Sequence, residues 1–184
     1  PIKSSAASDV YKRQKQMKAL DEEGMIASDT ITDLLENKIV LIVPTGNEKK
    51  LEKFEDIENA DSIALGDPAS VPAGQYAQEI FTNLKNWNDV KKKASFGTNV
   101  TEVLNWVAKG SASCGVVYET DAASNKDVKV LAEAPADALK TPVIYPVAAL
   151  KKSKNKDAAD KFVKFLQSEK ALRVFKSYGF TINK

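Results

Sequence analysis

The sequence predicts an α/β fold with a largely parallel sheet, because segments of strand character alternate with segments of helical periodicity along most of the 184 residues. The clearest strand, residues 38–44, is a continuous apolar, β-branched run that ends at a proline. A run that is apolar on both faces is typical of a sheet covered by helices on both sides. A chain of this length accommodates one domain or two small lobes.

The first fourteen residues differ in character from the rest. Asp9 to Gln14 is what the codons GAT GTG TAT AAG AGA CAG encode, and these resemble a transposase adaptor used in sequencing libraries. We therefore treat residues 1–14 as a non-native segment and exclude them from the fold prediction. The alternative is a natural N-terminal arm.

The first half of the chain predicts short elements around the apolar runs. Apolar spacing and a stop at Gly24 indicate a first helix, and a second helical turn follows it. Helical spacing of Tyr76, Ala77, Ile80 and Phe81 indicates a longer helix after Gly74. The expected elements are helices over 16–24, 29–36, 51–59 and from Gln75 to about Trp87, with strands over 38–44 and 62–65.

The second half repeats the alternation. Asn99 and Glu102 fit a capping box at the start of a helix that Gly110 ends. Two prolines in residues 142–150 predict an extended segment with edge character. The other expected elements are strands over 114–118 and 128–132, an amphipathic helix over 157–166, and a last helix from Ser168 through Phe175 that Gly179 closes.

Composition excludes several kinds of site. The chain has no histidine, which removes the commonest general base and metal ligand. Its one cysteine, Cys114, permits no intramolecular disulfide and lies in an apolar run that predicts a buried thiol. A net charge of +2 with dispersed lysines does not indicate a nucleic-acid partner. We find no apolar run long enough for a membrane span and no signal peptide.

The stretch from Ile63 to Ala77 predicts a buried strand, a loop with two prolines and the opening of a helix. The N–H groups of Ala73, Gly74 and Gln75 are expected at that helix start, where N–H groups lack intrahelical partners and face the positive end of the helix dipole. This is a candidate anion site. The alternative is an ordinary strand–loop–helix joint, which the local pattern alone favours.

Three positions lie at strand ends or helix starts: Ala73, Val100 just after the cap Asn99, and Tyr118 at the end of its strand. Ligands of α/β sheets bind at the carboxyl ends of strands. Two helix starts and a tyrosine hydroxyl can therefore converge on one small anion through neutral donors. The alternative for Tyr118 is a strand-end residue whose hydroxyl is in water.

At these residues the chain resembles the periplasmic molybdate-binding proteins of ABC transporters, from about Lys15 to the C-terminus. The matching segments are Ala64-Leu65-Gly66-Asp67-Pro68, Val71-Pro72-Ala73-Gly74, Tyr76-Ala77, Asn99-Val100, Gly115-Val116-Val117-Tyr118, Asp121-Ala122, Tyr145-Pro146-Val147 and Phe175-Lys176-Ser177-Tyr178-Gly179-Phe180.

The resemblance implies a type II periplasmic binding protein, in which two α/β lobes close on molybdate or tungstate. It implies that the N–H groups of Ala73 and Val100 and the hydroxyl of Tyr118 bind the oxyanion, with molybdenum held as the oxyanion and no direct protein–metal ligand. Two serines from the first lobe complete the family's shell. We do not assign their role to Ser4, Ser5 or Ser8, and we expect the first part of lobe 1 to be missing.

The same resemblance implies a domain layout. Residues 15–43 are the remnant of lobe 1, residues 44–140 form lobe 2, and residues 141–184 return to lobe 1. The hinge is expected near Val43-Pro44 and Lys140-Thr141-Pro142.

The expected function is that of a non-enzymatic component of a molybdate/tungstate importer, without a cofactor. The expected location is periplasmic, or extracellular and lipid-anchored, and the complete protein is expected to be a monomer with a membrane permease as partner. The alternatives are a protein that binds sulfate or phosphate, an enzyme on the same fold, and a ligand-sensing domain of a regulator.

Other conspicuous residues are interpreted structurally. Asp67 is expected to cap its loop, and Glu119 and Asp121 lack the spacing of a metal site. Trp87 and Trp106 are expected to pack, as are the apolar stripes with Phe162, Phe165 and Phe175. The lysine-rich residues 151–154 indicate a solvated loop, with a transporter-facing surface as the alternative.

Overall fold

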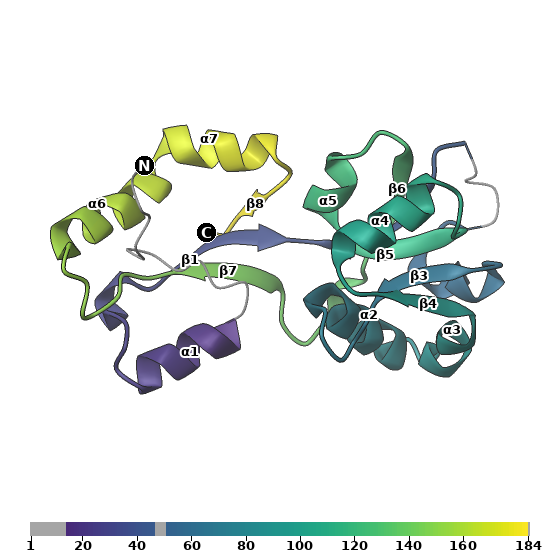
Figure 1. Ribbon diagram of the computed structural model, residues 1–184, viewed down its shortest axis with the longest axis horizontal. Coiled ribbons are helices and arrows are strands. Elements are labelled where there is room, and N and C mark those ends of the chain that lie inside the picture. The colour runs from purple at the N-terminus through teal and green to yellow at the C-terminus, as the bar shows by residue number, and fades with distance from the viewer. Residues whose placement is uncertain (1–13, 47–50, 184) are drawn as a thin grey trace. The chain divides into compact units, whose positions relative to one another are not determined.

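A computed structural model describes residues 14–46 and 51–183 (Figure 1). It divides into two compact units, which we call unit 1 (Pro1–Asn37 with Val143–Lys184) and unit 2 (Lys38–Pro142). The prediction for residues 1–14 lies outside the described residues, apart from Gln14, which begins the first helix. The mixed α/β class with two sheets confirms the predicted fold class.

Unit 1 contains a three-stranded antiparallel sheet in the order β7-β1-β8. Leu35 in the central strand pairs with Tyr145 on one side and Ile182 on the other. The edge position of β7 agrees with the prolines of that segment. The elements are α1 (Gln14–Glu22), η1 (Ser28–Thr30), β1 (Thr32–Asn37), β7 (Val143–Val147), α6 (Lys156–Leu166), α7 (Glu169–Ser177) and β8 (Thr181–Ile182).

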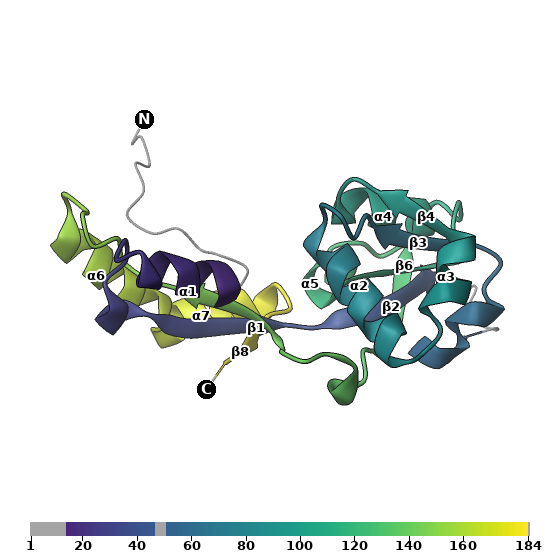
Figure 2. The ribbon, with the colours of Figure 1, turned by 90° about the horizontal axis from the view of Figure 1, so that it is seen from below.

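Unit 2 contains a five-stranded mixed sheet in the order β4-β3-β5-β2-β6, with helices packed against it (Figure 2). β3 runs parallel to β4 and β5, whereas β2 is antiparallel to both β5 and β6. The elements are β2 (Ile39–Pro44), η2 (Phe54–Asn59), β3 (Ile63–Gly66), α2 (Pro72–Asn83), α3 (Trp87–Lys93), β4 (Ala94–Gly97), α4 (Val100–Ala108), β5 (Cys114–Tyr118), α5 (Glu119–Ala123), β6 (Val128–Glu133) and η3 (Ala136–Ala138).

The expectation of a largely parallel sheet was therefore too simple. β2 enters unit 2 from the preceding strand of unit 1 and inserts against the direction of its neighbours. All three strands of unit 1 pair antiparallel. An apolar run predicts a buried strand, but the run carries no information on the direction of its partners.

The core of unit 2 is built around β2. Val40, Leu41 and Ile42 have no exposed surface, and burial of each such side chain contributes about 1.5–3 kcal/mol. Val40 and Ile42 pack with residues of α4 and β5, among them Val103, Val107 and Val117. Both faces of β2 are covered, so the strand is apolar along its length. This is why a continuous apolar run predicted it.

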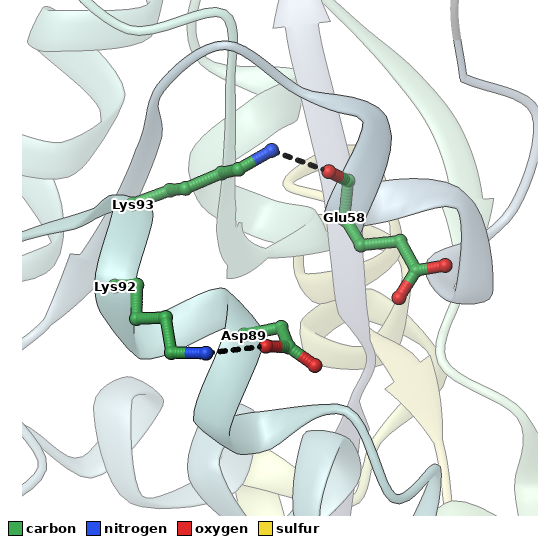
Figure 3. Close-up of polar contacts among 4 residues, drawn as sticks. All are labelled: Glu58, Asp89, Lys92 and Lys93. Atoms are coloured by element: carbon green, nitrogen blue, oxygen red, sulfur yellow. Dashed lines mark hydrogen bonds and ion pairs between the residues drawn. The ribbon is translucent and has the colours of Figure 1, made fainter.

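Lys93, the last residue of α3, connects that helix to the end of η2. Its Nζ donates to the carbonyl oxygen of Glu58 at 2.6 Å (Figure 3). It also donates to the carbonyl oxygen of Ala60 at 3.2 Å, at the C-terminal end of η2. The charge of Lys93 suits its position because carbonyl groups at the end of a helix carry partial negative charge. The preceding residue, Lys92, donates from Nζ to Oδ1 of Asp89 at 2.8 Å, and Asp89 lies about one turn earlier in α3.

Residues 29–36 do not form the expected helical turn. The chain makes only the short η1 and then the strand β1, in which Leu34 and Leu35 are both buried. Pairing with β7 and β8 outweighs the local helical preference, since tertiary contacts routinely override propensity.

The division between units also differs from the sequence-based boundaries of 43/44 and 140/141. The chain crosses between units at Asn37/Lys38 and at Pro142/Val143. The first crossing comes earlier because the whole of β2 pairs inside unit 2.

Two elements of unit 2 also differ from the prediction. Residues 94–97 form the strand β4, which was not expected. The helix α2 ends at Asn83 and not near Trp87.

The aromatic stripes near the C-terminus are only partly buried. Phe175 packs edge-on against Phe180, and Phe180 packs against Tyr145. Phe162 and Phe165, however, are 44% and 49% exposed. Helical periodicity shows that a face is apolar but not that something covers it, and the described residues leave this face of α6 uncovered.

Candidate anion-binding site

Three parallel strands of unit 2 end at one edge of the sheet. β3 ends at Gly66 and β4 at Gly97, and these two glycines are register partners. β5 runs parallel to β3 and ends at Tyr118. The helices α2 and α4 begin just after β3 and β4, so Ala73, Val100 and Tyr118 are all positioned at this edge.

The start of α2 is set by proline and by a turn. Pro72 is the first helical residue, after Val71 in extended conformation. Asp67 organises the preceding loop, because its carbonyl oxygen accepts from Val71 N at 2.7 Å and its Oδ1 accepts from Ala69 N at 2.9 Å. The interpretation of Asp67 as a loop cap is therefore confirmed.

Proline has no N–H group, so Ala73 and Gly74 carry the first N–H groups of α2, at positions that lack intrahelical acceptors. Gln75 N donates to Val71 O at 3.1 Å. The helix thus begins three residues earlier than expected, and Gln75 does not belong to the candidate donors. Ala73 is 1% exposed, which keeps its backbone in a low-dielectric environment.

The start of α4 is a cap of the predicted kind. Glu102 N donates to Asn99 Oδ1 at 2.9 Å. In a capping box the Glu102 side chain would accept from the N–H of Asn99. Here Glu102 Oε2 instead accepts from Thr98, one residue earlier, at 2.7 Å from Thr98 N and 3.0 Å from Thr98 Oγ1. The cap occupies the N–H of Glu102, and the N–H of Val100 lies at the first helical position, where a helix supplies no acceptor.

Tyr118 is 5% exposed and stands at the junction of β5 and α5. Its ring meets the ring of Tyr76 edge-on, with centroids 6.4 Å apart and an interplanar angle of 74°. Tyr76 lies in the first turns of α2, so this contact links the end of β5 directly to that helix. Sequence reasoning placed Tyr76 in the matching motif but missed its packing role.

The chemistry of this edge is that of neutral hydrogen-bond donors. The carboxylates in the loops before α2 and at the start of α4, those of Asp67 and Glu102, both accept from backbone N–H groups. Among the residues that the structure describes, no group of three or more acidic or cysteine side chains forms a metal site. Backbone N–H groups and a hydroxyl can bind an anion without proton transfer.

Cys114, at the other end of β5, does not contribute. It is fully buried, and burial raises the pKa of its thiol to about 12. In residues 14–46 and 51–183, none of the helices is both long and apolar enough to cross a bilayer. Trp87 packs against Phe96, and Trp106 packs against the core of unit 2, as their apolar positions predicted.

Comparison with known proteins gives consistent matches. The family model described as bacterial extracellular solute-binding protein matches residues 2–181, and its match extends into the segment that was excluded from the fold prediction. A Bacillus subtilis (strain 168) lipoprotein, provisionally named as the substrate-binding protein of an ABC transporter, is 41% identical over 96% of this chain and 65% of its own length. The molybdate-binding protein ModA of Haemophilus influenzae is 39% identical over 98% of this chain and 73% of its own length.

A solved structure agrees with this result. The substrate-binding domain of a provisionally named molybdenum ABC transporter from Clostridium difficile superimposes with a TM-score of 0.87 and is 38% identical. The superposition covers 99% of this chain and 79% of that one. The chain thus spans about two thirds to three quarters of the length of the curated relatives named above.

Proposed function

The chain belongs to the family of bacterial extracellular solute-binding proteins, and from this premise we propose that it is the substrate-binding component of a molybdate/tungstate ABC importer. The ligand is a tetrahedral oxyanion, and the N–H groups of Ala73 and Val100 and the hydroxyl of Tyr118 donate to it. The names of the relatives in Haemophilus influenzae and Clostridium difficile support this choice of ligand.

The observation that carries the proposal is the shared edge of β3, β4 and β5. It brings two helix starts and a buried tyrosine to one place, although the three residues are far apart in the sequence. Helix starts attract anions because their N–H groups lack partners and lie at the positive end of the helix dipole. The aligned starts of α2 and α4 therefore suit a doubly charged ligand.

Neutral donors fit the chemistry of molybdate. A hydrogen bond to a charged group contributes about 1.5–3 kcal/mol, and a fully ionised oxyanion accepts several without exchanging a proton. The resemblance to molybdate-binding proteins implies that two serines complete the shell. We leave that part of the shell unassigned, because Ser4, Ser5 and Ser8 lie outside the described residues.

The partner that follows from this proposal is the membrane permease of an ABC transporter, and the location is the outer side of the cytoplasmic membrane. The lipoprotein relative in Bacillus subtilis supports a lipid-anchored form. The role is binding without catalysis, and it needs no cofactor.

The test is calorimetric titration of the full-length protein with molybdate, tungstate and sulfate. We expect molybdate and tungstate to bind far more tightly than sulfate. Tyr118→Phe should weaken molybdate binding about ten- to a hundredfold, because one hydrogen bond to a charged ligand is lost. Tyr178→Phe is the matched control, since Tyr178 is 68% exposed and lies in unit 1, and its affinity should not change.

Equal affinity for molybdate in the wild-type protein and Tyr118→Phe would refute the role of the hydroxyl. A full-length protein that prefers sulfate would refute the choice of ligand. Sulfate is the second candidate because the same neutral donors suit any fully ionised tetrahedral anion.

A further inference from the structure

We propose that Gly66 and Gly74 are positioning residues, which hold the N-terminus of α2 against the end of β3 so that the donor at Ala73 is correctly placed before the ligand arrives. The inference rests on the proposed oxyanion site and assigns a role to two residues that do not themselves donate to the ligand. It concerns unit 2 alone.

The contact between the two glycines is closer than any side chain permits. A Cβ built on Gly74 would lie 2.1 Å from the carbonyl oxygen of Gly66 and 2.5 Å from its carbonyl carbon. It would also lie 2.9 Å from the carbonyl carbon of Asp67. All three atoms are backbone atoms at the end of β3, so they cannot rotate aside as a side chain does.

The second glycine faces the same contact from the strand. A Cβ on Gly66 would lie 2.6 Å from Cγ1 of Val71, the residue that caps α2, and 3.1 Å from the N atom of Gly74. The backbone conformation at Gly66 and Gly74 does not require glycine, because neither has a positive φ. The absence of a side chain therefore serves close approach, which is a packing reason for glycine.

This contact lies next to the candidate donor. Gly74 follows Ala73 directly, so a methyl group that pushes Gly74 away from the strand also displaces the N–H group of Ala73. The same strand end is tied to the start of α4, because Asp67 N donates to Gly97 O at 2.9 Å. Gly97 lies two residues before the cap Asn99, so the two helix starts share one hydrogen-bonded frame.

Such a frame matters because donors that are already in place need no reorganisation when the anion binds. Supporting residues that leave a site about 1 Å too loose weaken binding even when every direct contact is present. The two glycines thus act through Ala73, and a substitution there should reduce affinity more than its effect on stability predicts.

The matched control is Gly115→Ala. A Cβ on Gly115 would lie 2.8 Å from Val107 Cγ2 and 3.0 Å from Ala64 O, so it also forces a buried helix away from the sheet. That clash, however, involves Val107 in the second half of α4, away from Val100, and Ala64 in β3, and it touches no residue of α2. Gly115→Ala therefore reports the cost of overpacking in unit 2 without a direct clash between Gly66 and Gly74.

The experiment compares molybdate dissociation constants and melting temperatures for full-length wild type, Gly74→Ala and Gly115→Ala. We expect Gly74→Ala to weaken molybdate binding at least about tenfold and Gly115→Ala less than about threefold, although both lower the melting temperature. An equal loss of affinity in the two variants would reduce Gly74 to a structural role and overturn the inference.

A rescue experiment covers the case in which Gly74→Ala does not fold. The closest clash at Gly66 is with the side chain of Val71, so Gly66→Ala should weaken molybdate binding. Shortening Val71 should relieve this clash. In the Val71→Ala background, Gly66→Ala should therefore cost at most half of the affinity that it costs in the wild type, with affinity measured as the logarithm of the dissociation constant. An equal cost in the two backgrounds would overturn the inference. Wild-type protein that binds no oxyanion refutes the proposed function, whereas tight wild-type binding with unchanged variants refutes only the role of the glycines.

Discussion

Replacement of Asn99 by alanine should destabilise unit 2 and leave its core intact. The side chain of Asn99 accepts from Glu102 N at 2.9 Å, and this is the bond that caps α4. Alanine removes the acceptor, so one N–H group at the start of the helix loses its partner. Because α4 packs on β2, β3 and β5, fraying of its first turn affects the whole unit.

The loss of such a cap costs about 1 kcal/mol, which corresponds to about 4–8 °C in the melting temperature of a domain of up to about 100 residues. The assay is thermal unfolding followed by tryptophan fluorescence. Both tryptophans of the chain, Trp87 and Trp106, lie in unit 2, so the signal reports the unit that contains the cap.

Two variants control the interpretation. Asn105→Ala changes the same residue type at an exposed position of the same helix, and it should leave the melting temperature unchanged or slightly higher because alanine has the better helix propensity. Asn99→Asp keeps the cap and its stability, but it places a negative charge beside the proposed anion site and should weaken molybdate binding. If Asn99→Ala melts at the same temperature as the wild type, the cap does not contribute and the reasoning fails.

Three further predictions follow from the burial and charges of unit 2. Leu41→Ala should destabilise it by about 2–5 kcal/mol in urea unfolding, because Leu41 has no exposed surface; a loss below about 1 kcal/mol would mean that the core collapses around the cavity. The pKa of the Cys114 thiol is raised to about 12 by burial, so a thiol reagent at pH 8 should label Cys114 only after denaturation, and rapid labelling of folded protein would contradict its burial. The hydrogen bond from Lys92, together with its charge, lowers the pKa of Asp89. The ion pair therefore favours folding above the ordinary carboxyl pKa, and this stabilisation is lost as the pH falls through the lowered pKa. An NMR titration of Lys92→Ala should show a higher pKa for Asp89 than in the wild type, and an unchanged pKa would contradict the role of Lys92.

The candidate site was partly predictable because its signals are local. Pro72, the cap residue Asn99 and the apolar run that ends at Tyr118 mark helix starts and a strand end within a few residues each. The structure confirms the start of α4 and the end of β5, whereas α2 begins at Pro72, three residues before the expected Gln75. The donor roles of Ala73 and Val100 stay a prediction. The contact between Tyr76 and Tyr118 was not predictable, since the two rings come from elements 42 positions apart.

The errors have the same origin. Residues 29–36 read as a helical turn because Leu34, Leu35 and Glu36 suit a helix as well as a strand, and only pairing with β7 and β8 decides between them. Phe162 and Phe165 read as core because an apolar stripe normally faces a partner, whereas the described residues leave them half exposed. In both cases the outcome depends on segments remote in the sequence, because β7 and β8 pair with residues 32–37 whereas no described segment covers Phe162 and Phe165.

The sequence by itself determined the buried strands β2, β3 and β5, the start of α4 and the absence of histidine chemistry, because these depend on residue type and on neighbours one to four positions away. Only the tertiary structure decided that β2 belongs to unit 2, that it runs against its neighbours, and that the ends of β3, β4 and β5 meet at one edge. The physical reason is that strands pair through backbone groups that every residue carries. The order of a sheet therefore depends on how the whole chain buries its apolar surface, and the close contact of Gly66 with Gly74 depends on it in turn.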